Sequence, residues 1–337
     1  MRTIAYLIGA LMALIQPPVV MAQSQTAGTI VMEFDLSAHP ADQEARLWIP
    51  YPVSDQDQLI TDISVSGDFA ESGVYTDRTY STPILYARWD KGASERRLTL
   101  SFHAVRREVV KKDFPTREDA WNPADHARYL APTRLGPVDG PVKALADEIT
   151  VGKTTVLAKA RAIYDWICDN MHRDPSTRGC GAGDVCLLLL TPGGKCTDIH
   201  SVFVALCRAA GVPAREVFGI RMGKEAVADI SAGQHCWAEF FLPGFGWVPV
   251  DPADVLKAML TENLAPEDAR AKEYREYFWG AWDSYRVKLA MGRDLLLNPR
   301  QEGAPLNTFG YPYAEVGGKA LDWLDPKGFR YTFAYRR

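Results

Sequence analysis

The chain has 337 residues, a length that accommodates two domains of ordinary size or one domain with large additions. Hydrophobic residues make up 47% of the sequence and charged residues 24%, which is typical of a globular protein. The net charge of −4 produces no long-range field that would attract nucleic acid, so nucleic acid is excluded as an expected partner.

The first 22 residues have the layout of a secretory signal peptide. Arg2 supplies a positive charge, an apolar run extends from Ile4 to Ile15, and the small-residue sequence "VMA" ends at Ala22. The apolar run is too short to span a bilayer, so no stable membrane span is expected in the mature chain. We therefore expect cleavage near Ala22 and export to the periplasm or beyond.

Residues 27–112 follow the period of antiparallel strands. Apolar residues occur at every second position over Ile30–Leu36, Ala45–Ile49 and Leu98–Ala104, and polar turns separate these stretches. This pattern predicts a small β-rich N-terminal domain and favours a sandwich over a barrel.

Residues 113–141 show little periodicity and carry prolines and charges, which indicates a linker packed on the surface. A helical pattern follows over 155–172, with apolar residues three and four positions apart. Thr154 or Thr155 could cap this helix. The remainder, 142–337, is expected to form a core with a C-terminal extension.

A second helix begins near Cys196. Residues Val202–Cys207 are apolar at every position, and a helix that is apolar all round is buried all round. Gly211 ends the helix and Pro213 prevents its continuation. Strands are predicted after it over 215–222, 235–242 and 246–251, with a final strand over 329–335.

An exported chain with six cysteines meets an oxidising compartment. Cys180 and Cys186 lie in the loop "RGCGAGDVC", close enough in sequence for a local disulfide, which we expect although spacing alone does not establish geometry. Cys168 and Cys207 lie among apolar residues of predicted helices and are expected to be buried free thiols.

Cys196 has the surroundings of a nucleophile. A thiol attacks as the thiolate, and the unpaired N–H groups and dipole of a helix N-terminus favour that negative charge. Gly193 and Gly194 leave the approach to the sulfur open. The backbone N–H of Cys196 also suits one half of an oxyanion hole.

Two histidines compete for the role of base. His200 lies one turn further along the same buried helix, so a structural or supporting role is favoured for it. His235 begins a strand on which His235, Trp237 and Glu239 share one face, and Cys236 points to the other face. If an odd-numbered hairpin loop follows, centred on Pro243, His235 pairs directly with Asp251, which would orient the imidazole.

Two segments and the spacing between them resemble the bacterial transglutaminase-like family, whose architecture is similar to that of papain-type cysteine peptidases. The segments are "GGKCTDIHSVFVALCRAAGVPAREVFGIR" and "HCWAEFFLPGFGWVPVDP", within roughly Lys143 to Val255. The later segment "FGYPYAEVGGKALDWLDP" resembles exported members but carries no catalytic motif. The resemblance implies an α+β fold in which a central helix packs on an antiparallel sheet, here preceded by the small β-sandwich-like domain.

The resemblance implies a catalytic triad of Cys196 as nucleophile, His235 as base and Asp251 as the residue that orients it. Asp198 and Trp237 match the family pattern and are expected to support the site. Gln234 and Trp166 are candidates for a second oxyanion donor.

The family resemblance implies thiol chemistry on an amide, either hydrolysis of a peptide or isopeptide bond or transfer of the acyl group to an amine. A protein or peptide substrate is expected, such as cell-wall peptide, and no cofactor. The alternative is a catalytically idle binding or assembly module, because fold does not choose among functions. A metal site built from Cys196, His200, Cys207 or His235 is disfavoured, because their spacing fits no common zinc pattern.

Overall fold

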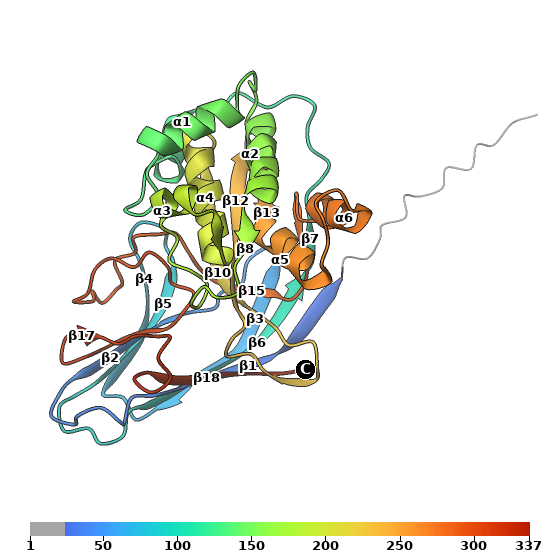
Figure 1. Ribbon diagram of the computed structural model, residues 1–337. Coiled ribbons are helices and arrows are strands. Elements are labelled where there is room, and N and C mark those ends of the chain that lie inside the picture. The colour runs from blue at the N-terminus through green and yellow to red at the C-terminus, as the bar shows by residue number, and fades with distance from the viewer. Residues whose placement is uncertain (1–23) are drawn as a thin grey trace, which may run out of the picture.

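The computed structural model describes residues 24–337, and the predicted signal peptide lies outside this range. Within it, none of the helices combines the length and the apolar character needed to cross a bilayer. Figure 1 shows a helical half that contains α1 to α4 above a β-rich half. The C-terminal segment returns to the β-rich half, where β1 also lies.

Two five-stranded sheets form the β-rich half. The first has the order β11-β18-β1-β6-β3 and the second the order β17-β16-β2-β5-β4. The strands of the first sheet are β1 (Gln25–Asp35), β3 (Gln58–Gly67), β6 (Arg97–Arg107), β11 (Val227–Asp229) and β18 (Arg330–Arg336). Those of the second are β2 (Ala45–Pro50), β4 (Glu71–Thr76), β5 (Pro83–Trp89), β16 (Tyr313–Val316) and β17 (Lys319–Ala320).

The inward side chains of both sheets share one apolar core, as the alternation of the sequence predicts. Ile30, Phe34 and Phe102 from the first sheet and Leu47 and Trp89 from the second are all buried in it. Two stacked antiparallel sheets with a common core make a sandwich, so the predicted β-rich N-terminal region is confirmed.

Strands from outside 27–112 complete both sheets. The antiparallel register of β1 against β18 runs from Thr29–Arg336 to Asp35–Arg330, and β16 pairs with β2. β11, from the middle of the chain, pairs with β18. The predicted final strand thus belongs to the sandwich. A division of the chain at residues 112 and 141 stays a prediction.

The helical half is built on a four-stranded antiparallel sheet of order β13-β12-β10-β15. Its strands are β10 (Ala214–Arg221), β12 (Gln234–Leu242), β13 (Gly246–Val250) and β15 (Arg286–Met291). The helices are α1 (Gly140–Ile149), α2 (Val156–Asn170), α3 (Val185–Leu190), α4 (Cys196–Ala209), α5 (Pro252–Glu262) and α6 (Ala269–Tyr277). Helix α4 packs on this sheet and against α1, α2 and α3 (Figure 1).

All 14 residues of α4 are buried, which confirms the central helix predicted from its apolar run. Ile199, Phe203 and Leu206 are fully covered by the surrounding helices and sheet. An element enclosed on every side holds its N-terminal residue in a fixed place. Cys196 is that residue.

The segment 113–141 packs against the helical half and includes a 3-10 helix, Pro123–Tyr129. Its Glu118 carboxylate accepts hydrogen bonds from the first two backbone N–H groups of α2, at Val156 and Leu157. The Thr155 side chain caps the same helix, as one of the two predicted candidates.

Two short pairings complete the fold. β7 (Val109–Val110) pairs with β14 (Ala281–Trp282), and β8 (His172–Arg173) pairs in parallel with β9 (Gly193–Gly194). In the second pairing, Gly193 and Gly194, which directly precede Lys195 and Cys196, are held against β8.

Candidate active site

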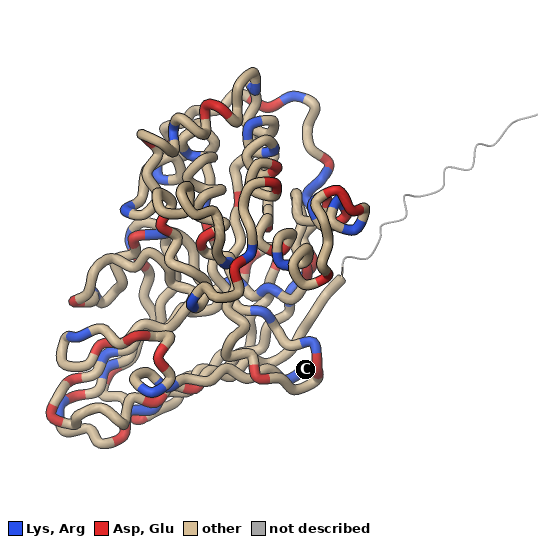
Figure 2. The backbone as a smooth tube through the Cα atoms, viewed as in Figure 1, with Lys and Arg blue, Asp and Glu red and all other residues tan. Residues whose placement is uncertain are grey.

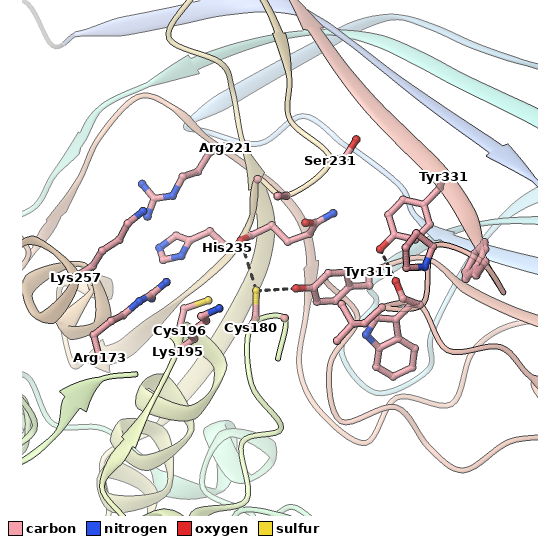
Figure 3. A pocket seen from close by; sticks show the side chains of 18 residues that line it. Arg173, Cys180, Lys195, Cys196, Arg221, Ser231, His235, Lys257, Tyr311 and Tyr331 are labelled. Atoms are coloured by element: carbon pink, nitrogen blue, oxygen red, sulfur yellow. Dashed lines mark hydrogen bonds between the residues drawn. The ribbon is translucent and has the colours of Figure 1, made fainter. Parts of the chain in front are cut away.

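A cavity of about 550 Å³ lies where the helical half meets the C-terminal segment. Cys196 and His235 both line it, and Figure 3 shows their side chains next to each other in its wall. Asp251 lies behind His235, fully buried. The structure therefore brings together the three residues predicted as a triad.

The start of α4 is held by Asp198. One carboxylate oxygen accepts the backbone N–H of Lys195 at 3.1 Å and the other accepts that of Gly183 at 2.8 Å. A Cβ at Gly194 would lie 2.4 Å from the Asp198 carboxylate, so only glycine fits at this approach. Asp198 thus ties two loops to the N-terminus of the helix and does not face the reacting sulfur's cavity.

The Gly-rich loop places Cys180 beside Cys196. The backbone N–H of Thr197 donates to the Cys180 carbonyl at 2.9 Å. The Cys180 sulfur accepts from the Tyr311 hydroxyl at 3.1 Å and lies 3.5 Å from the Gln234 carbonyl (Figure 3).

The disulfide predicted between Cys180 and Cys186 is not formed, since both thiols are free. The physical reason is that the two cysteine side chains point into different surroundings. Cys180 faces the cavity, whereas Cys186 is exposed on α3. Cys168 and Cys207 are buried free thiols, as expected.

His235 is oriented by Asp251, but not through the predicted strand pairing. The β12–β13 hairpin pairs Leu242 with Gly246 around a three-residue loop, and the pairing ends at Ala238–Val250. The loop has an odd number of residues, but it is centred one residue later than expected, so the direct pairing of His235 with Asp251 is wrong. Asp251 is instead the N-cap residue of α5 and contacts the imidazole from beyond the strand end.

Asp251 receives four donors. Its two carboxylate oxygens accept from His235 Nε2 at 2.7 Å, from His200 Nε2 at 3.1 Å, from the Asp254 backbone N–H at 2.8 Å and from Arg286. Burial opposes ionisation of Asp251, but Arg286 and the two histidines overcome it and hold its pKa well below the usual range. The orienting residue is therefore a permanent carboxylate.

His200 occupies the buried side of this network. It has no exposed surface, and its Nδ1 lies 3.5 Å from the Cys236 sulfur while its Nε2 contacts Asp251. With both ring nitrogens engaged and the ring outside the cavity lining, His200 positions Asp251 and does not face the nucleophile. This agrees with the supporting role favoured from the sequence.

Arg286, on β15, is fully buried and was not predicted from the sequence as a site residue. Its guanidinium donates to Asp251 and, at 2.6 Å, to Asp254, and it lies 3.1 Å from Asp283. Arg221 also contacts Asp254 at 2.5 Å. No local pattern marks these arginines, because their partners come from strands and helices distant in the sequence.

Metal-ligating atoms of His235, Asp251 and Asp254 lie within 4.8 Å of one another. The position that a cation would take between the carboxylates is filled by the Arg286 guanidinium. The donor set is therefore already neutralised by a protein cation and does not fit a bound metal ion.

The pKa values of Cys196 and His235 are shifted in opposite directions. Contacts with Cys180 and Cys236, and then with the His235 imidazole, lower the pKa of the Cys196 thiol well below its usual value although burial opposes this. Burial and Arg221 oppose protonation of His235, but Asp251 and Asp254 prevail and raise its pKa. The pair is thus biased toward thiolate and imidazolium.

Three further residues were predicted to support the site or to donate to an oxyanion, and only one of them lines the cavity. Trp237 lies in a small cluster with Val109, Val217 and Trp282, and its ring centroid is 6.3 Å from that of His235. Gln234 lines the cavity, and its side-chain nitrogen is buried without an acceptor among residues 24–337. Trp166 lies on α2 outside the cavity lining, so it is not placed to donate to an oxyanion.

A buried cysteine at a helix start, facing a carboxylate-held histidine on an antiparallel sheet, is the arrangement typical of proteins with a papain-like core. The sequence matches the model of the transglutaminase-like superfamily over residues 143–252. An uncharacterized protein from Haemophilus influenzae is 39% identical over 330 residues, which cover 90% of this chain and 89% of the relative. The chain belongs to the transglutaminase-like superfamily.

Two further similarities are more limited. A protein-glutamine gamma-glutamyltransferase from Pseudomonas aeruginosa is 28% identical over 52% of this chain, a match that spans 27% of that relative. A solved structure from Cytophaga hutchinsonii, described as that of a candidate cysteine protease, aligns with 94% of this chain and 100% of its own. Its TM-score is 0.51 at 17% identity, which concerns the fold alone. Family and fold together support cysteine-dependent acyl transfer as a chemistry open to this chain.

Proposed function

We propose that the protein is an exported enzyme that transfers acyl groups from amides through a thioester on Cys196. The observation that carries the proposal is the line of contacts from Cys196 through His235 to the fully buried Asp251 carboxylate. A protein or peptide substrate fits the class of amide chemistry, and the signal-peptide pattern at the N-terminus supports export.

In the first half-reaction, the Cys196 thiolate attacks the amide carbonyl carbon and a C–S bond forms. The backbone N–H of Cys196, at the first position of α4 where no intrahelical acceptor exists, can donate to the resulting oxyanion. Since Nε2 of His235 is committed to Asp251, its Nδ1 carries the proton to the departing nitrogen. The C–N bond then breaks, and the amine leaves with that proton.

In the second half-reaction, water or a second amine attacks the thioester. His235 accepts the proton of the attacking group, the C–S bond breaks, and the thiolate is restored. Water yields hydrolysis, and an amine yields transamidation. The similarity to a protein-glutamine gamma-glutamyltransferase supports the second outcome as one that a substrate search should include.

The proposal is tested by the rate of alkylation against pH, with reducing agent present and the labelled peptides mapped by mass spectrometry. Iodoacetamide should modify Cys196 rapidly below pH 7, where an ordinary thiol of pKa about 8.5 reacts slowly. His235→Ala should remove this low-pH reactivity, and Cys196→Ala should remove the labelled peptide. His200→Ala should have a smaller effect, since Asp251 keeps its contact with His235.

The exposed Cys186 serves as the reference thiol in the same sample. A Cys196 profile that coincides with that of Cys186 would contradict the proposal and leave the binding or assembly module as the better account.

A further inference from the structure

Among residues 24–337, those that line the cavity around Cys196 include cations and no carboxylate. Four basic residues line it, namely Arg173, Lys195, Arg221 and Lys257. Over the rest of the molecule, positive and negative residues are interspersed along the backbone (Figure 2), and the net charge is −4. The positive potential is therefore a local property of this cavity.

Three of these cations have no partner. Arg221 is paired with Asp254, but the side chains of Arg173, Lys195 and Lys257 form no ion pair and donate no hydrogen bond within residues 24–337. Burial and then the charge of Arg221 lower the pKa of Lys257, and Arg173 adds to this effect. Cations that repel one another in a partly enclosed cavity are stabilised by an arriving anion.

Three of the four cations are grouped on one side of the cavity. In Figure 3, Arg173, Arg221 and Lys257 lie on the side of His235 away from Cys180, Lys195 lies next to Cys196, and Tyr311 and Tyr331 lie beyond Cys180. Trp323 stacks on Tyr311 and Phe329 packs against Tyr331, with ring centroids 6.3 and 5.2 Å apart, so both belong to that aromatic side of the cavity wall. The cavity thus offers a charged half and an apolar half on either side of the reacting sulfur.

We propose that the substrate is an acidic peptide, with one or more carboxylates near the scissile amide that bind Arg173, Lys195 and Lys257. This inference rests on the proposed function, since it takes Cys196 as the point of attack. Charge-assisted hydrogen bonds to the cations hold the carboxylates, and the aromatic half accommodates an apolar part of the same peptide.

The first test compares two alkylating probes of similar size, iodoacetate, which is anionic, and iodoacetamide, which is neutral. The rate with iodoacetate divided by the rate with iodoacetamide at Cys196 should fall about fivefold in Lys257→Gln. It should fall further in the double variant with Arg173→Gln, since each substitution removes a cation from the path of the anion. Lys272→Gln, an exposed lysine on α6, is the matched control and should leave the ratio unchanged. High salt should lower the wild-type ratio.

The second test measures protection of Cys196 from iodoacetamide by N-acetylated, C-amidated triglutamate or triglutamine. Triglutamate should protect and triglutamine should not, and the double variant should lose the protection. An unchanged rate ratio in the double variant, or equal protection by both peptides, would overturn the acidic-substrate inference. Failure of iodoacetamide to reach Cys196 at low pH would instead overturn the proposed function, so the two failures are distinguishable.

Discussion

At the scale of single residues, the site depends on the hydrogen bonds that the Asp251 carboxylate accepts. Its carboxylate is fully buried and accepts from two histidines, one arginine and one backbone N–H. A carboxylate with this many donors stays charged and does not rotate, so it fixes the tautomer and plane of His235. Within residues 24–337, the charge of Arg286 is in turn compensated by this acidic group and its neighbours Asp254 and Asp283.

Replacing Asp251 by Asn should damage both stability and reactivity. The change keeps the shape but leaves the buried Arg286 charge with one partner fewer, which costs about 3 kcal/mol of unfolding free energy. The amide also presents an N–H to one of the two histidines, so His235 loses its fixed tautomer. Urea unfolding measures the first effect, and iodoacetamide labelling of Cys196 at pH 6 the second. An unchanged labelling rate would show that Asp251 does not orient the base.

Asp254 supplies a prediction for acid stability. Its folded-state pKa is lowered to about 2; burial and the neighbouring Asp251 oppose this, but Arg221, His235 and Arg286 outweigh them. A depressed carboxylate pKa contributes stability that is present above the unfolded value near 4 and is lost as the pH falls through 2. The free energy of unfolding should therefore fall between pH 4 and pH 2, with about 2 kcal/mol of the fall due to this group. Asp254→Asn should be less stable at pH 5 and show a shallower decline, as urea titrations at a series of pH values would measure.

At the scale of elements, α4 and the segments at its N-terminus decide where the nucleophile lies. The helix is enclosed by α1, α2, α3 and the sheet, and its first turn is tied to β9 and to the Cys180 loop by Asp198 and by the Thr197 N–H. Because Asp251 is the N-cap residue of α5, a second helix start delivers the carboxylate that contacts His235. The candidate triad is therefore assembled from two helix N-termini and one strand.

Gly194→Ala should disturb this assembly. The added Cβ would lie 2.4 Å from the Asp198 carboxylate, so Asp198 or the strand β9 must move. We expect a loss of about 2 kcal/mol of unfolding free energy, as for other overpacked sites, together with slower low-pH labelling of Cys196. Gly310→Ala is the control, because its nearest neighbour would be 3.4 Å away. Equal stability of both variants in thermal unfolding would show that the close approach is not needed.

At the scale of the whole molecule, the chain ends join the two halves. β18 lies between β1 and β11, so the last strand pairs with the first strand and with a segment that precedes His235. The cavity wall also combines α4 and β12 with Tyr311, Phe329 and Tyr331 from the C-terminal segment. The C-terminal segment therefore completes the wall of the cavity that contains Cys196.

Tyr335→Ala should destabilise the protein, because it removes a contact between the last strand and the first. Tyr335 is fully buried on β18, and its hydroxyl donates to the Ala27 carbonyl at 2.7 Å. Removal of the ring should cost about 4 kcal/mol, as for other large aromatic residues in cores. The adjacent exposed Arg336→Ala should have a small effect. Thermal unfolding followed by tryptophan fluorescence measures both variants, and a Tyr335→Ala midpoint equal to that of wild type would contradict the packing described.

The sequence by itself determined the local elements and indicated the residues of the candidate site. A run of apolar residues predicted the buried helix of Cys196, alternation predicted the sandwich strands, and the transglutaminase-like motifs indicated Cys196, His235 and Asp251. These features are local because helix and strand periods and helix stop signals act over a few residues.

Only the tertiary structure decided which distant groups meet. Arg286, Arg221 and Asp254 enter the network of Asp251 from separate elements, and Cys180 turns toward Cys196 and not toward Cys186. The turn between β12 and β13 is also centred one residue later than predicted, so His235 does not pair with Asp251. Contacts of this kind depend on the packing of elements far apart in the chain, and no short sequence pattern specifies that packing.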